Sequence, residues 1–258
     1  MSATKGHFVW YDLMTTDTEG ARAFYTHAIG WGIEMWEGGD HPYPMWKAGE
    51  KAIGGVMPLP EDARKGGVPP HWIAYISTPD LDATTAKAQE LGAAVLVPAT
   101  EIPDGGRFAI LQDPQGAAFG VHSSAGENAG LSGPPGTGHV GWRELAVGDY
   151  EAAYDFYSAL FGWEKTLAMD MGEGAMYQMY RAPGMEYDLG GMFNKPAEMP
   201  SSWLYYIKVD AVDSAIARIR EAGGQVISGP MEVPGGDHVA QCTDPQGAFF
   251  AIMGPGTA

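Results

Sequence analysis

The sequence predicts an α+β fold made of two similar halves in tandem, each holding a β-α-β-β-β pattern twice. Three observations support this prediction. Two blocks of sequence recur near the start and the end of each half, short strand-like runs surround helix-like segments, and glycines stand where helices and turns should end. We call each β-α-β-β-β pattern a module.

The internal repeat has two blocks. Residues 7–31 align without a gap on residues 139–163, and 10 of the 25 positions are identical. A second block, Asp-Pro-Gln-Gly-Ala at 113–117, recurs at 244–248. Identity at this level is far above chance, so the chain is interpreted as a duplication.

The duplication predicts the domain boundaries. We expect an N-terminal domain over residues 1–123 and a C-terminal domain over residues 138–258. The linker between them, residues 124–137, is rich in Gly, Ser and Pro and has no periodic apolar pattern. Such a composition is typical of a connection between domains.

The elements of the first half follow from local patterns. Alternation over residues 9–14 predicts a strand, and Thr16 or Asp17 can cap the helix that follows and ends at Gly30. A second helix should end at Gly92. The other expected strands are residues 33–36, 44–48, 53–57, 75–77, 94–97, 108–111 and 118–121. The second half repeats the pattern through residues 142–147, 150–161, 204–209 and 212–222.

Composition excludes several functional classes. The 15 basic and 32 acidic residues give a net charge of −17 at pH 7, so binding to nucleic acid or to an anionic membrane is not expected. No run approaches 18 apolar residues, so no membrane span is expected. The single cysteine, Cys242, excludes an internal disulfide, and the first residues lack the apolar run of a signal peptide. We therefore expect a cytoplasmic protein.

Four short motifs give the chain a family resemblance. They are Phe-Tyr at 24–25, Gly-Trp at 30–31, Leu-Gly-Ala at 91–93 and Asp-Pro-Gln-Gly at 113–116. In this order they resemble the vicinal oxygen chelate superfamily, which includes glyoxalase I, bleomycin-resistance proteins and extradiol dioxygenases. The resemblance implies that each half packs two modules into a half-open barrel around a concave cavity. It does not fix the reaction, because one fold hosts many chemistries.

The resemblance also implies positions for metal ligands. These positions hold residues that cannot ligate a metal, since ligation needs a nitrogen, oxygen or sulfur donor. They are Trp10, Gly55, Ile73 and Gly120 in the first half, and Trp142, Gly191, Leu204 and Ala251 in the second. We therefore predict no cofactor and no metal site of the usual kind.

A shifted metal site is the alternative. Side chains two residues apart on a strand share a face, which places Asp12, His71 and His122 beside the usual positions. Two histidines and one carboxylate form the ligand set of non-haem iron enzymes, so a divalent metal could bind there. The competing interpretation is that both histidines lie near strand ends and are solvated or hydrogen-bonded.

Trp10-Asp12 and Trp142-Glu144 are the best candidates for function. Alternation places the indole and the acid on one face of the first strand of each half. A carboxylate beside an indole can gain a raised pKa and act as a general base, so Asp12 and Glu144 are the candidate catalytic residues. The acids could equally orient a ligand, or bond a neighbouring strand or an arginine such as Arg107 or Arg143.

Trp72 and Trp203 are further candidates for ligand binding. Binding pockets are lined mainly by aromatic and apolar groups with few polar ones. The competing interpretation for these tryptophans is packing in the core. Trp31 and Trp163, which end helices, are expected in the core.

Three functions remain open from the sequence. The first is a metal-free protein that binds a small aromatic or amphipathic molecule in a Trp-lined cavity, as a monomer or homodimer. The second is a metal-dependent enzyme of the glyoxalase or dioxygenase type that uses Asp12, His71 and His122. The third is an interaction protein whose cavities are vestigial.

Overall fold

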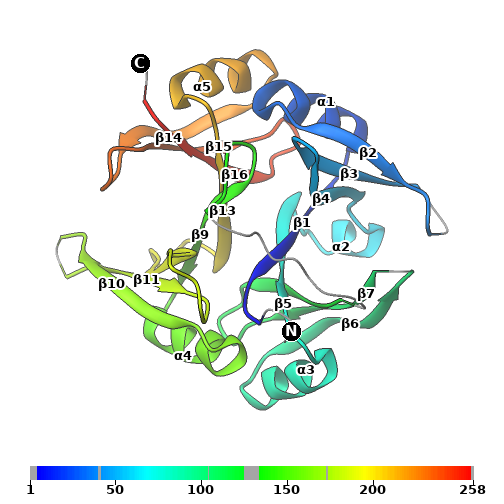
Figure 1. Cartoon of the computed structure of the whole chain (residues 1–258), viewed down its shortest axis with the longest axis vertical. Coiled ribbons are helices and arrows are strands. Elements are labelled where there is room, and N and C mark those ends of the chain that lie inside the picture. Colours follow the sequence, from blue (N-terminus) through cyan, green and yellow to red (C-terminus); the bar gives the residue numbers. More distant parts are fainter. Residues whose placement is uncertain (1–4, 40–41, 104, 125–133, 173, 257–258) are drawn as a thin grey trace. The chain divides into compact units, whose positions relative to one another are not determined.

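The computed structural model describes residues 5–39, 42–103, 105–124, 134–172 and 174–256 (Figure 1). The strands form two eight-stranded sheets. Their strand orders are β2-β3-β4-β1-β5-β8-β7-β6 and β10-β11-β12-β9-β13-β16-β15-β14. Each sheet ends on two different strands and is therefore not closed into a barrel. The predicted α+β class with half-open sheets is confirmed.

Four modules have the predicted β-α-β-β-β order. The first consists of β1 (Phe8–Thr15), α1 (Thr18–Ile29), β2 (Gly32–Trp36), β3 (Tyr43–Ala48) and β4 (Lys51–Pro58). The second consists of β5 (His71–Ser77), α3 (Leu81–Glu90), β6 (Ala94–Ile102), β7 (Gly106–Gln112) and β8 (Ala118–Ser123). The third consists of β9 (Val140–Val147), α4 (Tyr150–Phe161), β10 (Glu164–Asp170), β11 (Met176–Arg181) and β12 (Gly190–Asn194). The fourth consists of β13 (Ser202–Lys208), α5 (Val212–Glu221), β14 (Gln225–Glu232), β15 (His238–Thr243) and β16 (Phe249–Gly254). A short helix, α2 (Glu61–Lys65), joins the first two modules.

Pairing within each module follows one rule. The first strand pairs in parallel with the last, as in β1 with β4 and β9 with β12. The three later strands form an antiparallel meander. The helix supplies the crossover that a parallel connection requires.

Helix ends obey the local signals. The side chain of Asp17 accepts a hydrogen bond from the backbone N–H of Gly20, and Asp149 caps α4 in the same way. Gly30 and Gly162 end their helices in the left-handed conformation, with φ of 85° and 74°. The duplicated Asp and Gly positions therefore set both helix lengths.

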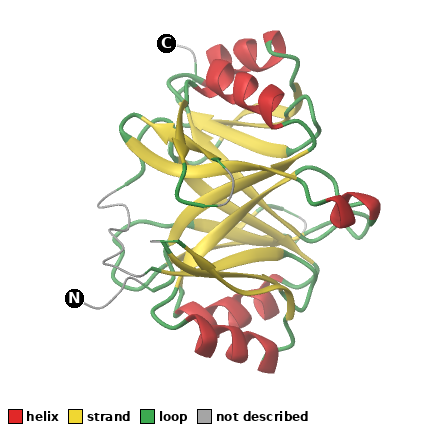
Figure 2. Cartoon of the chain, turned by 90° about the vertical axis from the view of Figure 1, so that its right-hand side faces the viewer, coloured by secondary structure: helices red, strands yellow, loops and turns green. Residues whose placement is uncertain are grey.

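The chain divides into two compact units, and neither coincides with a repeat. One unit contains Met1–Val9, Ala74–Pro134 and Trp142–Trp203; the other contains Trp10–Ile73, Pro135–Gly141 and Leu204–Ala258. Each unit thus combines one module from each repeat. Helix α1 packs beside α5 in one unit and α3 beside α4 in the other, and each helix pair covers one face of its strands (Figures 1 and 2). The sequence domains 1–123 and 138–258 stay a prediction, and residues 125–133 of the linker lie outside the described residues.

The tryptophans that follow α1 and α4 form hydrogen bonds between the two repeats within each unit. Trp31 is 3% exposed and Trp163 is 1% exposed, which confirms their predicted place in the core. Nε1 of Trp31 donates to the backbone oxygen of Gly138 at 2.6 Å. Nε1 of Trp163 donates to that of Gly6 at 2.8 Å. The tryptophan of each Gly-Trp motif therefore donates to the backbone of the other repeat.

Among the described residues, no helix is long and apolar enough to cross a membrane.

Candidate functional site

Trp10, Asp12 and Tyr43 form a hydrogen-bonded group on the first sheet. Nε1 of Trp10 donates to the Tyr43 hydroxyl at 2.8 Å and to Oδ1 of Asp12 at 3.0 Å. The Tyr43 hydroxyl donates to the same carboxylate oxygen. Asp12 is 5% exposed, whereas Trp10 and Tyr43 are half-buried. Strand β1 thus supplies an indole and an acid on one face, and β3 adds a phenol.

The second repeat builds the same kind of group from Trp142, Tyr177 and Glu144. Nε1 of Trp142 donates to the Tyr177 hydroxyl at 2.7 Å, and that hydroxyl donates to Oε2 of Glu144 at 3.0 Å. All three side chains are half-buried. Each group lies entirely within one compact unit. We call the two groups the strand clusters.

Glycines make room for the two tyrosines. Gly55 pairs with Asp12 in the parallel β1–β4 ladder, and Gly191 pairs with Glu144 in the corresponding ladder. A Cβ atom at Gly55 would overlap the Tyr43 ring, and one at Gly191 would overlap the Tyr177 ring. A glycine within a strand permits such a close approach, because it has no side chain.

The residues present do not fit the metal that the fold family implies. Indole, aliphatic and glycine side chains stand at all eight expected ligand positions, and none of them ligates a metal. At Gly55 and Gly191 a tyrosine ring also fills the space that a ligand side chain would need. Each strand cluster includes one of these positions, Trp10 or Trp142, and its tyrosine lies against another, Gly55 or Gly191.

The histidines of the shifted set bond to nearby backbone. Nδ1 of His71 lies 2.8 Å from the oxygen of Pro69, and Nε2 of His122 lies 3.1 Å from the oxygen of Gly105. Burial lowers the pKa of His122, which favours its neutral form. In the part of the chain that the structure describes, no three His, Cys, Asp or Glu side chains gather closely enough to hold a metal. The site with Asp12 stays a prediction from the sequence.

Trp72 and Trp203 donate to buried tyrosines. Nε1 of Trp72 lies 3.0 Å from the Tyr25 hydroxyl, which donates to Oδ2 of Asp244 at 3.2 Å. In the other unit, Nε1 of Trp203 lies 3.2 Å from the Tyr157 hydroxyl. That hydroxyl donates to Oδ2 of Asp113 at 3.1 Å. We call these two networks, Trp72–Tyr25–Asp244 and Trp203–Tyr157–Asp113, the core triads.

The aspartates of the core triads also hold their own turns. Oδ1 of Asp244 accepts the backbone N–H groups of Gln246 and Ala248, each at 2.9 Å. Asp113 does the same in its turn. Burial raises the pKa of both aspartates, although the backbone and tyrosine hydrogen bonds oppose this shift. The Asp-Pro-Gln-Gly motif is thus a buried link between repeats as well as the predicted turn.

Three other candidate groups have structural partners or are inert. Arg107 forms ion pairs with Asp82 at 2.7 Å and Glu101 at 2.9 Å. The guanidinium of Arg143 is buried and lies 5.3 Å from the centre of the Phe8 ring. Burial raises the pKa of the Cys242 thiol to about 12, which favours the protonated thiol at neutral pH.

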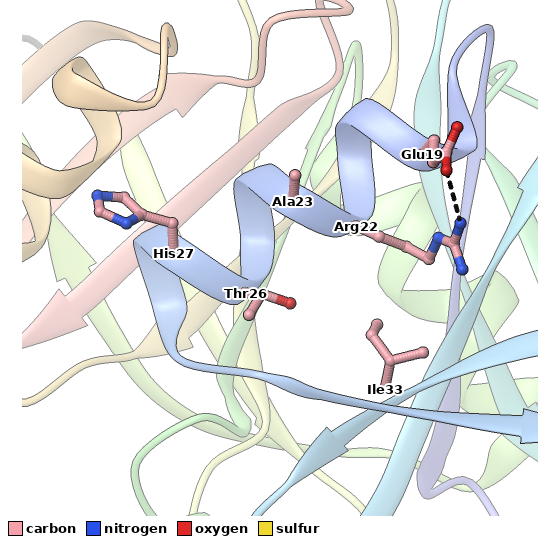
Figure 3. A pocket seen from close by; sticks show the side chains of 6 residues that line it. All are labelled: Glu19, Arg22, Ala23, Thr26, His27 and Ile33. Atoms are coloured by element: carbon pink, nitrogen blue, oxygen red, sulfur yellow. Dashed lines mark ion pairs between the residues drawn. The ribbon is translucent and has the colours of Figure 1, made fainter.

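An open groove of about 590 Å³ lies along α1 on the same unit as the first strand cluster (Figure 3). Its lining residues are Glu19, Arg22, Ala23, Thr26, His27 and Ile33. Glu19 and Arg22 face each other at 3.9 Å, and His27 lies 3.4 Å from Glu221. None of the residues that the sequence nominates for function lines this groove.

Sequence reasoning missed the two tyrosines of the strand clusters. Tyr43 and Tyr177 are 134 residues apart, so the gapless alignment at an offset of 132 does not pair them. A recurring Tyr-x-Met-aromatic pattern at 43–46 and 177–180 was the available signal. The buried roles of Asp113 and Asp244 were also missed, because a turn signal does not reveal the partner of its carboxylate.

Comparison with known proteins identifies the family. The profile of the Glyoxalase/Bleomycin resistance protein/Dioxygenase superfamily matches residues 6–121 and 136–252. The chain belongs to this superfamily. Each repeat matches the family model once, so the chain carries two copies of the superfamily domain in tandem.

Two relatives match the chain over nearly its whole length. A Mycobacterium tuberculosis (strain CDC 1551 / Oshkosh) protein named "Putative glyoxylase CFP32" is 35% identical over 249 residues, which cover 95% of this chain and 94% of the relative. The anthracycline biosynthesis protein DnrV of Streptomyces peucetius is 28% identical over 257 residues, which cover 95% and 91%.

A solved structure shares the fold. It is the Mn(II)-bound glyoxalase from Novosphingobium aromaticivorans, with a TM-score of 0.66 and 16% identity over 97% of this chain and 82% of that chain. At this identity the likeness shows the fold alone.

Proposed function

We propose that this protein binds small aromatic or amphipathic molecules at its two strand clusters without a metal. One observation carries the proposal. Both repeats form a hydrogen-bonded Trp–Tyr–carboxylate group, and its tryptophan is at a position that the family resemblance implies for a metal ligand. Half-buried rings offer apolar surface, and a few fixed polar atoms can orient a ligand.

The proposed contact residues are those of the strand clusters. Trp10 and Trp142 would supply ring surface, and Asp12 and Glu144 would supply the charged acceptors. We leave Trp72 and Trp203 out of the proposed contacts, because they bond to the fully buried tyrosines of the core triads. No catalytic step is part of the proposal.

A relative's name suggests a first probe. DnrV is named as an anthracycline biosynthesis protein, and anthracyclines are planar, polycyclic and amphipathic. An anthracycline therefore belongs to the ligand class that the strand clusters favour. We propose the class and use the anthracycline only as its representative.

The experiment is a calorimetric titration of EDTA-treated protein with an anthracycline. Saturable binding is the expected result. Substituting both Trp10→Ala and Trp142→Ala should weaken affinity about tenfold or more, because each change removes a half-buried aromatic anchor. The melting temperature should fall by less than about 4 °C, since neither indole is fully buried.

Phe249→Ala is the matched control. Phe249 is an aromatic side chain that is 59% exposed on β16, so its loss should leave affinity unchanged. A large loss of stability with unchanged affinity in the Trp10→Ala, Trp142→Ala variant would defeat the assignment of these residues.

The rival function is a metal-dependent enzyme, which the name of the mycobacterial relative suggests. Metal analysis and an activity assay distinguish the two. Stoichiometric uptake of manganese, nickel, zinc or iron by the untagged protein, followed by metal-dependent turnover of a glyoxalase or dioxygenase substrate, would reject the metal-free proposal.

A further inference from the structure

The sheet faces that carry the two strand clusters differ, next to the cluster, in one pair of side chains. Beyond the acid of the first cluster, β1 continues on the same face with Met14, and the corresponding residue of β9 is Ala146. In the parallel ladders, Met14 pairs with Met57 of β4, and Ala146 pairs with Phe193 of β12. The first face therefore continues with two methionines, and the second continues with an alanine and a phenyl ring.

The neighbouring positions on these faces are matched. Met45 of β3 pairs with Gly55, and Met179 of β11 pairs with Gly191. Each of these two methionines stands two residues after the tyrosine of its cluster. The two repeats thus share a tryptophan, an acid, a tyrosine, a glycine and one methionine. The difference beside the clusters is the pair that extends the first and last strands of the module.

The phenyl ring of the second face is stacked on the tyrosine of its cluster. The rings of Tyr177 and Phe193 are 18° from parallel, and their centres are 6.1 Å apart. This is the offset-stacked geometry that aromatic rings favour. Both side chains are half-buried, so part of each contacts solvent. Such a surface favours a flat polycyclic ligand, because a planar molecule adds a further ring to an ordered stack.

The methionines of the first face form a different surface. Met57 is 38% exposed, and Met14 beside it is buried. A thioether side chain has three rotatable bonds and adapts its shape, so methionine surfaces suit ligands of varied shape. Trp36 meets the Tyr43 ring edge-on, with an angle of 89° between the rings and 6.4 Å between their centres. Methionine has no ring, so the stack of the second face has no counterpart at position 57.

We infer that the two strand clusters bind different classes of ligand. The second cluster, in which Tyr177 is stacked on Phe193, takes flat polycyclic aromatic molecules. The first cluster, beside Met14 and Met57, takes flexible amphipathic molecules with an aliphatic chain. This inference rests on the proposed function and assigns its two ligand classes to separate sites.

The experiment compares two neutral alcohols that differ in shape. The probe 9-anthracenemethanol is flat and aromatic, whereas 1-octanol is flexible and aliphatic. Calorimetric titration of the EDTA-treated full chain should show a single tight site for each alcohol. Saturation with one alcohol should leave the affinity for the other unchanged, because the two occupy different sites.

Phe193→Leu and Met57→Ala are the paired variants. Phe193→Leu removes the ring but keeps an apolar side chain, so the affinity for 9-anthracenemethanol should fall by about three- to tenfold, the range of one aromatic pair. Its affinity for 1-octanol should not change. Met57→Ala should do the reverse and weaken 1-octanol binding about threefold or more, because it removes apolar contact surface. Phe249→Ala, which truncates an exposed ring on β16, should change neither affinity.

Transferring the second pair to the first face should produce a gain of binding. Met14→Ala together with Met57→Phe reproduces the Ala146–Phe193 pair beside Tyr43. This variant should bind a second molecule of 9-anthracenemethanol per chain and bind 1-octanol more weakly. Damage to the sheet face would not produce such a gain. If thermal unfolding shows that the double variant is not folded, the Phe193→Leu result decides alone.

The outcomes separate the inference from the proposed function. Opposite effects of Phe193→Leu and Met57→Ala on the two alcohols support the inference. Equal weakening of both alcohols, competition between them for one site, no binding of 1-octanol, or no gain in the folded double variant would overturn it. If an anthracycline still binds in any of these cases, and Trp10→Ala with Trp142→Ala weakens it, the proposed function survives. If neither the anthracycline nor either alcohol binds, both fail.

Discussion

The core triads and the strand clusters use the same three kinds of side chain in the same order, but they differ in burial and in origin. In both, an indole N–H donates to a tyrosine hydroxyl, which donates to a carboxylate. Tyr25 and Tyr157 are fully buried, whereas Tyr43 and Tyr177 are half-buried. The comparison shows that this residue set alone does not define a role.

The core triads and the strand clusters also differ in whether their residues come from one repeat or from both. The triad residues Tyr25 and Asp244 lie 219 positions apart and come from different repeats. Trp10 and Asp12 of a strand cluster lie two positions apart on one strand. The triad aspartates also accept two backbone N–H groups each. A core triad therefore connects the two repeats, whereas a strand cluster lies within one repeat.

The largest expected effect comes from breaking both core triads at once by separating the repeats. Produced alone, residues 1–123 and residues 138–258 should not persist as stable monomers, because each would expose the face that packs on the other repeat. Since each half carries its own Tyr and Asp-Pro-Gln-Gly motif, each should self-associate, and mixing should restore a one-to-one complex. Size-exclusion chromatography and thermal unfolding measure this. If either half alone unfolds cooperatively as a monomer, the core triads are not needed for its stability.

Removing a triad carboxylate should have the next largest effect. Asp244→Ala leaves two buried backbone N–H groups and the Tyr25 hydroxyl without their acceptor, which should cost about 3 kcal/mol of unfolding free energy. Asp12→Ala removes the carboxylate that accepts from the half-buried Trp10 and Tyr43 side chains, and should cost about 1 kcal/mol. Urea denaturation of both variants tests the contrast. Equal losses would show that burial does not separate the two networks.

Removing a single hydroxyl gives a smaller but better matched comparison. Tyr25→Phe should cost about 1.5 kcal/mol, because the Trp72 indole and the Asp244 carboxylate both lose a buried partner. Tyr43→Phe should cost about 0.5 kcal/mol, since its site is half-buried, but should weaken ligand binding. Denaturation and titration of the same two proteins provide both readouts. A larger stability loss in Tyr43→Phe would reverse the comparison.

The smallest expected effect is a dependence on pH. Burial raises the folded-state pKa of Asp113 and Asp244, so between the ordinary aspartate pKa of about 4 and the raised value the folded state binds more protons than the unfolded state. Their contribution to stability should therefore increase as pH falls through that window. The difference in unfolding free energy between wild type and Asp113→Asn, Asp244→Asn should show this slope from pH 7 to pH 4. If this difference does not change with pH, the pKa values of Asp113 and Asp244 in the folded state are the ordinary ones.

Much of the fold follows from local sequence signals. Asp17, Gly30, Asp149 and Gly162 set the limits of two helices through bonds that span only a few residues. Alternation places Trp10 and Asp12 on one face of β1, where they bond to each other. Nearby atoms decide these features, so the sequence reveals them directly.

The site was only half predictable. Trp10, Asp12, Trp142 and Glu144 stand out because they sit at corresponding places in two repeats. Tyr43 reaches Asp12 from 31 positions away across a strand pair, and a one-residue change of register would turn it to the other face. The sequence carries the Tyr-x-Met-aromatic pattern but not the register that gives it meaning.

The sequence by itself determined the duplication, the four modules, the helix caps and the loss of ligating side chains at eight positions, because each depends on residue identity or on short-range geometry. Only the tertiary structure decided in which Trp–Tyr–carboxylate sets the tyrosine is fully buried and in which it is half-buried. Burial and long-range pairing depend on how modules from different repeats pack, as Tyr25 with Asp244 and Tyr157 with Asp113 demonstrate. The same packing turned a predicted turn motif into the link between the two repeats.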